Sequence, residues 1–353
     1  MNLNRAADAA KVPLLNLNRA ADAAKVPLLT HYKSCRLCPR NCGVNRLAGE
    51  IGFCGETSEL RIATAVIHKG EEPPLVGTGG SGTIFISGCN LRCAFCQNYQ
   101  ISQGEDENAS ENATSHSLGS QGSLGRTVSS QEFAQICVAL CEKGAENINI
   151  VTGSHAVPGL IEGFIAMRKV GVQLPILWNS SGYDGMESLE LLKDYVDIYL
   201  PDLKTLDSEV SGKFFNAPDY PDVAAAAILK MIEFAGGRFP KNAREKVIIR
   251  HLILPGYLES TRSVLRWFAD NVKDRAMLSL MTQYTPIPNR RRQMPRRYLS
   301  ADEYKTVIEW LDEFKIDDGF CQELVTGSDW LPDFKRHNPF SSELSVPVST
   351  SQT

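Results

Sequence analysis

The feature that most constrains the fold is a regular alternation of short apolar runs with helical segments from residue 83 onward. The apolar runs have the length of buried strands and lie at 83–87, 148–152, 175–178, 196–200, 247–254 and 277–281. Helical segments separate them, and the first begins with a capping box at Ser129 and Glu132. Six strands that alternate with helices imply parallel pairing through right-handed crossovers. We therefore expect an α/β fold, an incomplete (β/α)6 barrel over residues 83–315.

The sequence before this region divides into two parts. Residues 1–30 form an Ala-rich leader in which the string NLNRAADAAKVPLL occurs twice without a change, and we assign it no function. Residues 31–82 carry four cysteines, and their second part, 61–82, is rich in Gly and Pro, which predicts turns. We expect this segment to form a cysteine-bearing extension at the amino end of the barrel.

One later segment and the end of the chain are expected to lack a packed structure. Residues 104–128 are rich in Ser, Gly, Asn and acidic side chains and have almost no apolar content, which is typical of a mobile insertion. Residues 316–353 form a C-terminal tail. Its end is rich in Ser, Thr and Pro, so we expect that end to be disordered.

Composition excludes several functional classes. The chain has 353 residues, a net charge of −4 and a pI of about 5.9, so it has no general basic field for nucleic acid or an anionic membrane. No apolar run approaches the roughly 20 residues that span a bilayer. The amino end lacks a secretory signal. We therefore expect a cytoplasmic protein, with an organellar location left open, and neither a membrane nor a nucleic-acid partner.

The strongest chemical signal is a cysteine loop that directly follows the first apolar run. Cys89, Cys93 and Cys96 have the spacing C-x3-C-x2-C. Thiolates are soft ligands that suit iron–sulfur clusters. Three thiolates can hold three irons of a cubane, and the fourth iron then offers an open position to a substrate or cofactor. The alternative is a zinc loop whose fourth ligand comes from elsewhere in the fold.

With Phe95 before its last cysteine, this loop resembles the signature of the radical S-adenosylmethionine (SAM) superfamily, and the resemblance covers about residues 83–315. It implies a barrel of the radical SAM type, with a [4Fe–4S] cluster on Cys89, Cys93 and Cys96. It also implies that SAM binds the open iron, with Phe95 at the SAM site. Reductive cleavage of SAM would then give a 5′-deoxyadenosyl radical that abstracts a hydrogen atom from the substrate.

A closer resemblance includes the upstream sequence. The strings CRLCPRNCGVNR, GFCG and HKGEEPPLVGTGGSGTIFISGCNLRCAFCQNYQIS resemble the pyruvate formate-lyase activating enzyme-like subgroup. True activases are oxidoreductases that install a radical on a backbone glycine of a partner enzyme. The resemblance thus implies an electron donor such as flavodoxin or ferredoxin, and a protein as one candidate substrate. It identifies no residue that acts directly on the substrate.

Polar residues after the second and third strands are candidate SAM contacts, because barrel enzymes place their sites at the carboxyl ends of strands. Gly153 resembles part of the superfamily's SAM-amine turn, although the usual carboxylate is missing there. His155 is either an acid or base on the substrate side or a loop histidine without a chemical role. Asn179 and Ser181 match an activase turn that supports the SAM ribose and a monovalent cation, or they form an ordinary turn.

Candidates after the later strands follow the same reasoning. Asp202 and Lys204 resemble the Asp-x-Lys element of activases, where they would bind SAM or order the site; the alternative is a surface ion pair. Arg250 lies within an apolar strand and matches an activase arginine that contacts SAM, or it forms a buried salt bridge. Tyr284 either approaches the adenine or is a plain aromatic at the rim.

The second cysteine group consists of Cys35, Cys38, Cys42 and Cys54. Four thiols could bind Zn²⁺ or an auxiliary Fe–S cluster, or they could remain free or redox-active. Cys137 and Cys141 stand four apart on an expected helix, where we expect small buried side chains.

Three functional hypotheses remain open at this stage. The first is a radical SAM enzyme with an unidentified substrate, including glycyl-radical activation. The second is a non-enzymatic Fe–S or zinc protein that acts as a sensor or electron carrier. The third is a radical SAM enzyme that modifies RNA or a small molecule.

Overall fold

The computed structural model describes residues 27–103, 123–238, 244–287 and 294–350. Its strands are β1 (Leu60–His68), β2 (Ser81–Ile86), β3 (Arg126–Val128), β4 (Ile148–Val151), β5 (Ile176–Ser180), β6 (Ile198–Pro201), β7 (Ile248–Leu252), β8 (Met277–Met281), β9 (Gly319–Cys321) and β10 (Ser345–Thr350). Its α-helices are α1 (Pro73–Val76), α2 (Tyr99–Ser102), α3 (Ser130–Glu142), α4 (Val157–Lys169), α5 (Met186–Leu192), α6 (Ser208–Phe215), α7 (Tyr220–Arg238), α8 (Leu258–Asn271) and α9 (Ala301–Glu313). Short 3₁₀ helices lie at Leu28–Tyr32, Arg46–Ala48 and Arg244–Lys246.

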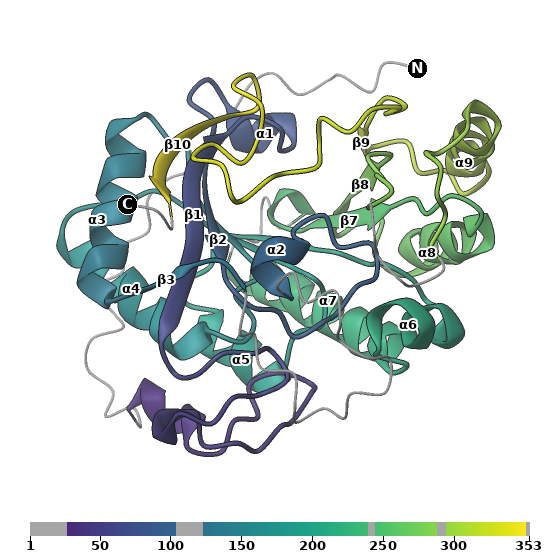
Figure 1. Cartoon of the computed structure of the whole chain (residues 1–353). Helices are drawn as coiled ribbons and strands as arrows, with labels where there is room; N and C mark the ends of the chain where they lie inside the picture. Colours follow the sequence, from purple (N-terminus) through teal and green to yellow (C-terminus); the bar gives the residue numbers. More distant parts are fainter. Residues whose placement is uncertain (1–26, 104–122, 239–243, 288–293, 351–353) are drawn as a thin grey trace.

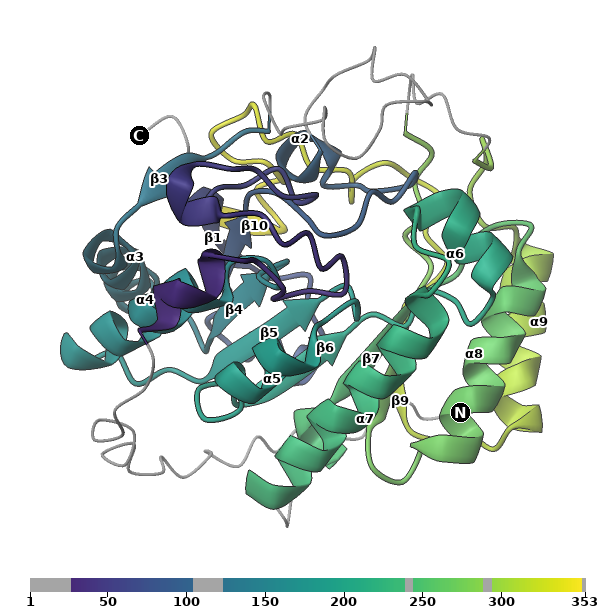
Figure 2. The ribbon, with the colours of Figure 1, turned by 90° about the horizontal axis from the view of Figure 1, so that it is seen from below.

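The parallel strands form a curved sheet with helices on its outer side (Figure 1 and Figure 2). Strands β2, β4, β5 and β6 pair in parallel in that order, and β7, β8 and β9 form a second parallel group. Isolated bridges from Tyr199 to Val247 and from Asp202 to Arg250 connect the two groups. The predicted α/β fold and partial barrel are therefore confirmed.

Both faces of the sheet are buried, because successive side chains of a strand point to opposite sides. Trp178 of β5 belongs to the main core that the helices cover. Its neighbour Leu177 instead packs with Leu75, Leu200 and Ile248 in a separate cluster on the inner face. Leu75 comes from α1, so this short helix contributes to the interior of the barrel. Strands buried on both faces read as continuous apolar runs, which is why they stand out in the sequence.

The start of α3 follows the local signal. Ser129 is the N-cap: its hydroxyl accepts the Glu132 N–H at 3.2 Å, and the Glu132 carboxylate accepts the Ser129 N–H at 2.8 Å. Both halves of the predicted capping box are present, and they satisfy main-chain donors that the first helical turn would otherwise leave open.

The segment 61–82 departs from the prediction of turns alone. Its first part belongs to β1, which pairs antiparallel with β2 and is buried along nearly its whole length. The run LRIATAVIH is rich in β-branched side chains, which suit a pleated and buried position. Only the part after His68 contains the turns that the Gly and Pro residues predict.

The end of the C-terminal tail was expected to be disordered, whereas the structure describes it as ordered up to residue 350. Strand β9 extends the sheet beside β8, and β10 pairs antiparallel with β1. Phe334 and Phe340 pack on Phe85 of β2, with ring centroids 5.4 Å and 5.6 Å apart. Apolar burial by these rings and main-chain pairing with β1 hold in place a segment whose own composition is polar.

The predicted insertion and leader lie largely outside the described residues. Of the insertion 104–128, residues 104–122 are outside, whereas β3 at its end pairs with β1, so this part is a strand and not a mobile loop. Residues 1–26 of the leader are also outside. In the helix α3, Cys137 is buried as predicted, whereas Cys141 is exposed, contrary to the prediction.

Candidate cluster and cofactor site

The loop that carries Cys89, Cys93 and Cys96 leaves β2 at the carboxyl end of the parallel strands. It turns sharply at Gly88, whose φ is +80°. A Cβ atom there would lie 2.5 Å from Cγ of Glu56, so this turn excludes a side chain. Cys93 is buried, and Cys89 and Cys96 are partly exposed.

Hydrogen bonds and ring packing hold the loop in shape. The N–H of Leu91 donates to the Cys89 sulfur at 3.3 Å, and the N–H of Ala94 donates to the Phe214 carbonyl at 2.8 Å. Phe95 is buried and packs edge-to-face on Phe215 at 5.6 Å. Phe95 thus ties the cysteine loop to α6, and its contact with SAM stays a prediction.

The three thiols influence one another electrostatically. Burial raises the pKa of the Cys93 thiol to about 12, and the neighbouring Cys96 adds to the rise, whereas Lys204 opposes it. Burial, followed by Cys93 and Cys96, also raises the pKa of Cys89. Three thiols this close would repel one another as free thiolates, whereas bound metal stabilises the deprotonated form.

This donor set fits an iron–sulfur cubane. Among the described residues, no three His, Cys, Asp or Glu side chains close around a single metal ion. In a [4Fe–4S] cluster each thiolate binds a different iron, so its sulfurs stand farther apart than the ligands of one ion. Three soft donors on one loop match that requirement and leave one iron without a protein ligand.

Asp202 and Lys204 form an ion pair beside this loop. Burial alone would lower the pKa of Lys204, but the Asp202 carboxylate and then the Cys93 sulfur outweigh it and raise that pKa. The Tyr220 hydroxyl accepts the Lys204 N–H at 3.0 Å and donates to the Ser181 carbonyl at 2.8 Å. The pair is largely buried, so it is not the surface ion pair that the sequence left as an alternative.

The turns after β4 and β5 lie next to each other. Thr152, with a φ of +64°, donates its N–H to the Asn179 carbonyl at 2.9 Å. Gly153 lies against the Trp178 ring, where a Cβ would come within 2.7 Å of a ring carbon. Ser181 is buried, and its hydroxyl accepts the Tyr183 N–H at 3.4 Å. The structure thus brings together Gly153, Asn179 and Ser181, and their roles toward SAM stay predictions.

Asp184 is a buried residue of this region that the sequence did not single out. It accepts hydrogen bonds from Ser154 at 2.6 Å and from the Trp178 indole at 3.4 Å, and it also accepts one from Ser180. Burial raises its pKa, and the hydrogen bonds oppose the rise. The carboxyl group thereby joins the turn after β4 to the end of β5. The short spacing between Ser180 and Asp184 was the sequence signal that could have identified Asp184 as a residue of this region.

Arg250 points into the barrel and forms a buried salt bridge. Its Nε donates to Glu72 at 2.9 Å, and its terminal nitrogen contacts both Glu71 and Glu72. Glu71 also accepts a hydrogen bond from the side-chain amide nitrogen of Asn149, at 3.0 Å. The side-chain oxygen of Asn149, Oδ1, is buried and has no hydrogen-bond partner among the described residues. The two glutamates precede α1 and are functional candidates that sequence reasoning missed.

Tyr284 and His155 occupy buried positions. Tyr284 is 1% exposed, and its hydroxyl donates to the Pro295 carbonyl at 2.7 Å, so it is not a rim aromatic; its ring belongs to the main core. His155 is 2% exposed, and Nε2 lies 2.8 Å from the Ser87 carbonyl. Burial, with Arg46 nearby, lowers the pKa of His155 to about 3, so the ring is neutral near pH 7.

The segment that carries the second cysteine group, purple in Figure 2, contacts the loop after β4 and the helix α5. The Leu37 carbonyl accepts the Ser188 hydroxyl at 2.5 Å, and Arg46 donates to the His155 carbonyl at 2.6 Å. Burial raises the pKa of Cys38 to about 12, and Cys54, Cys35 and Cys42 add to the rise. The other three sulfurs therefore lie within electrostatic range of Cys38.

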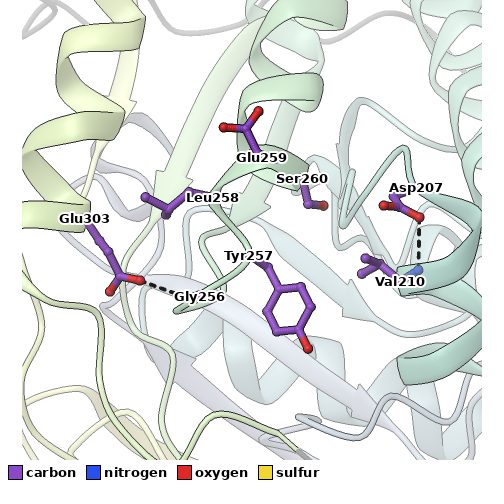
Figure 3. Close-up of a pocket in the computed structure, with 8 residues that line it drawn as sticks. All are labelled: Asp207, Val210, Gly256, Tyr257, Leu258, Glu259, Ser260 and Glu303. Atoms are coloured by element: carbon purple, nitrogen blue, oxygen red, sulfur yellow. Dashed lines mark hydrogen bonds between the residues drawn. The ribbon is translucent and has the colours of Figure 1, made fainter.

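A separate pocket of about 430 Å³ opens near the amino ends of α6 and α8 (Figure 3). It is lined by Asp207, Val210, Gly256, Tyr257, Leu258, Glu259, Ser260 and Glu303. Two of its carboxylates have main-chain partners: Asp207 accepts the Val210 N–H at 3.1 Å, and Glu303 accepts the Gly256 N–H at 2.7 Å. No cysteine lines this pocket, so it is not the cluster site.

Within the described part of the chain, no helix is both long and apolar enough to cross a membrane.

Comparison with relatives gives two curated matches, both uncharacterised proteins of Methanocaldococcus jannaschii. One is 30% identical over 288 residues, which cover 81% of this chain and 76% of that protein. The other is 33% identical over 82 residues, 20% of this chain and 24% of that protein.

Three solved structures show distant similarity. SuiB of Streptococcus suis, bound to its precursor peptide SuiA, aligns with a TM-score of 0.42 and 14% identity over 67% of this chain, which spans less than half (46%) of SuiB. QueE from Escherichia coli aligns with a TM-score of 0.43 and 12% identity, over 78% of this chain and 97% of QueE. A domain of pyruvate-formate lyase-activating enzyme from Bacteroides vulgatus aligns with a TM-score of 0.31 and 15% identity, over 46% of this chain and 89% of the domain.

A family model supplies the assignment. The model of the radical SAM superfamily matches residues 83–268, more than half of the 353 residues. The matched region contains Cys89, Cys93 and Cys96, and the family implies a [4Fe–4S] cluster and SAM as cofactors. With its partial barrel and its three-thiol loop at the strand ends, this chain belongs to the radical SAM superfamily and is a radical SAM enzyme.

Proposed function

We propose that the enzyme cleaves SAM reductively at a [4Fe–4S] cluster on Cys89, Cys93 and Cys96, and that hydrogen abstraction from a substrate follows. The observation that carries this proposal is the Asp202–Lys204 pair beside the cysteine loop, where Lys204 acts electrostatically on Cys93. When bound, the cluster supplies one electron and an open iron for the amine and carboxylate of SAM.

The chain's own residues prepare this site. Lys204 keeps its proton, because Asp202 and the cysteine sulfur stabilise the ammonium group. Its positive charge offsets the negative charge of three thiolates, and Asp202 fixes its direction. Phe95 holds the loop against α6. We assign Gly153, Asn179 and Ser181 to the SAM side of the site, since they come from adjacent strand ends.

An external low-potential donor must supply the electron. We propose a flavodoxin or ferredoxin for this role, because each reductive cleavage of SAM consumes one electron that the cluster must regain. As a finer proposal, the substrate is a protein and the enzyme is an activase that installs a glycyl radical. The Asp-x-Lys element at 202–204 supports it. A net charge of −4 does not favour RNA.

The first experiment tests SAM cleavage. The cluster is reconstituted anaerobically, SAM and dithionite are added, and 5′-deoxyadenosine is quantified. The wild type should form this product, and Cys93→Ala should not. Cys141→Ala is the matched control, because Cys141 is exposed on α3 and should leave product formation unchanged. A fully loaded cluster without product would contradict the proposal and favour the sensor or electron-carrier hypothesis.

The second experiment tests the substrate class. Extract of the source cells is separated by size, and each fraction is added to the reconstituted enzyme with SAM. An activase should form more 5′-deoxyadenosine with the protein fraction, and electron paramagnetic resonance should detect a glycyl radical there. Stimulation by the small-molecule fraction, or stimulation that ribonuclease abolishes, would replace the activase proposal with the third hypothesis.

A further inference from the structure

The second cysteine group has a charge arrangement that four free thiols do not explain. Arg46 is 1% exposed. Its guanidinium contacts the Thr57 and His155 carbonyls, lies 3.8 Å from the Cys35 sulfur and stacks 4.3 Å from the Tyr32 ring. None of these partners among the described residues is a carboxylate. A buried cation is costly unless an anion pairs with it.

The carboxylate of Glu56, which acts electrostatically on Cys54, is already engaged. Glu56 is 3% exposed and accepts Arg61 at 2.9 Å. The groups that act electrostatically on Arg46 are Cys54, Tyr32 and Cys35, and burial raises the pKa of Tyr32 to about 12, so its hydroxyl is neutral near pH 7. Buried thiols without metal are neutral, whereas metal-bound sulfurs are thiolates. A metal centre on four thiolates would therefore supply the missing anion.

Main-chain donors already point at the sulfurs of this group. Cys42 accepts from the N–H of Phe53 at 3.3 Å. Burial raises the pKa of Cys38 and of Cys54, and the main-chain N–H groups of Arg40 and Glu56 lower it. In the cluster loop, the N–H of Leu91 likewise donates to Cys89, at 3.3 Å. Hydrogen bonds to sulfur are among the protein's means of setting the potential of an Fe–S cluster.

The two cysteine groups touch. The N–H of Cys89 donates to the carbonyl of Cys54 at 3.4 Å, so a residue of one group is hydrogen-bonded to a residue of the other. Arg40 strengthens the junction: its Nε donates to the Asn90 carbonyl at 2.9 Å, and its guanidinium stacks on Phe53 at 3.8 Å. A centre on the second group would thus lie directly beside the centre that cleaves SAM.

We propose that Cys35, Cys38, Cys42 and Cys54 bind a second iron–sulfur cluster that passes single electrons to the cluster on Cys89, Cys93 and Cys96. A reduced flavodoxin or ferredoxin gives one electron to the second cluster, which becomes reoxidised as it reduces the first. No bond is made or broken in this transfer. The relay rests on the proposed SAM cleavage, whereas binding of the second cluster does not.

The binding experiment uses a variant that lacks the first site. Cys89→Ser, Cys93→Ser and Cys96→Ser are combined, and the protein is reconstituted anaerobically. The proposal predicts iron and acid-labile sulfide equivalent to one cluster per chain, and a paramagnetic signal on reduction. Addition of Cys42→Ser, at the only one of the four cysteines that is not fully buried, should remove that iron. Loss of all iron in the triple variant, or one zinc per chain, would overturn the proposal.

If the triple variant does not fold, a second measurement takes the place of the binding experiment. Wild-type protein should then carry more iron than Cys42→Ser, by the content of one cluster, and equal iron in the two would overturn the proposal. For the relay, Cys42→Ser should form 5′-deoxyadenosine with dithionite but lose it with reduced flavodoxin. Equal activity with both reductants would refute the relay alone. No product in the wild type, with a second cluster still bound in the triple variant, would refute only the proposed SAM cleavage.

Discussion

The imidazole of His155 donates a hydrogen bond through Nε2 to the main-chain carbonyl of Ser87, 2.8 Å away and two residues before Cys89. Its own carbonyl accepts Arg46. His155 therefore joins the second cysteine group to the start of the cluster loop. With a pKa of about 3 the ring stays neutral at neutral pH, and its hydrogen bond to Ser87 positions the start of the cluster loop.

Acid should weaken the fold through this ring. Burial lowers the pKa of His155 from 6.5 to about 3, so below pH 6.5 the unfolded chain binds a proton that the folded chain does not. Stability is then fully present above pH 6.5 and falls as the pH drops toward 3. His155→Gln keeps an N–H donor and removes the titration. Urea unfolding between pH 7 and 4 gives the slope of the unfolding free energy against pH. This slope should be smaller for the variant, by the amount that corresponds to about one bound proton. An identical dependence would contradict this account.

Removal of the Lys204 ammonium should impair SAM cleavage. A hydrogen bond that involves a charged group contributes about 1.5–3 kcal/mol, so Lys204→Met should slow 5′-deoxyadenosine formation roughly 10- to 100-fold. Iron content should be measured in parallel to show that the cluster is retained. Lys193→Met is the matched control, because Lys193 forms an exposed ion pair with Glu190. An unchanged rate for Lys204→Met would show that the Asp202–Lys204 pair does not contribute to SAM cleavage.

Arg250→Met should destabilise the protein, because it leaves the Glu71 and Glu72 carboxylates in the barrel without their cation. Loss of one partner from a buried pair costs about 3–5 kcal/mol. Urea unfolding measures the change, and addition of Glu72→Gln should restore part of the loss. If Arg250→Met kept its stability but lost SAM binding, the alternative of a direct SAM contact would be favoured.

The ordered tail makes its own prediction. Phe334 is buried against Phe85, and a Phe→Ala change in a core costs about 3–5 kcal/mol. Phe334→Ala should therefore lower the free energy of unfolding by that amount. Val346 of β10 is 41% exposed, so Val346→Ala should change it by no more than about 0.5 kcal/mol. Equal small effects at both positions would indicate that the tail does not pack as described.

The predictable part of the fold was the part with local signals. Six buried parallel strands read as apolar runs, and Ser129 identifies the start of α3 through bonds within four residues. β10 is different, because its order comes from pairing with β1, about 280 residues earlier in the sequence. The short string SVPVST at 345–350 does not carry information about such a partner.

The same distinction applies to the candidate site. The cysteine loop has all its donors within eight residues, so its spacing is visible in the sequence. The Arg250 partners are 178 and 179 positions away, and only the fold shows that they meet. Asp207, which caps α6 by accepting the Glu209 N–H at 2.8 Å, was a usable local signal for a helix that was not predicted.

The pairing of β1 with β10 has a consequence for synthesis in the cell. One edge of β1 is covered by residues 345–350, which are synthesised about 280 residues after it. Until they emerge, every nascent copy presents the main-chain donors and acceptors of Thr64–His68 to its surroundings, where a neighbouring chain could add a strand. The chain therefore protects this edge only after β10 has been made.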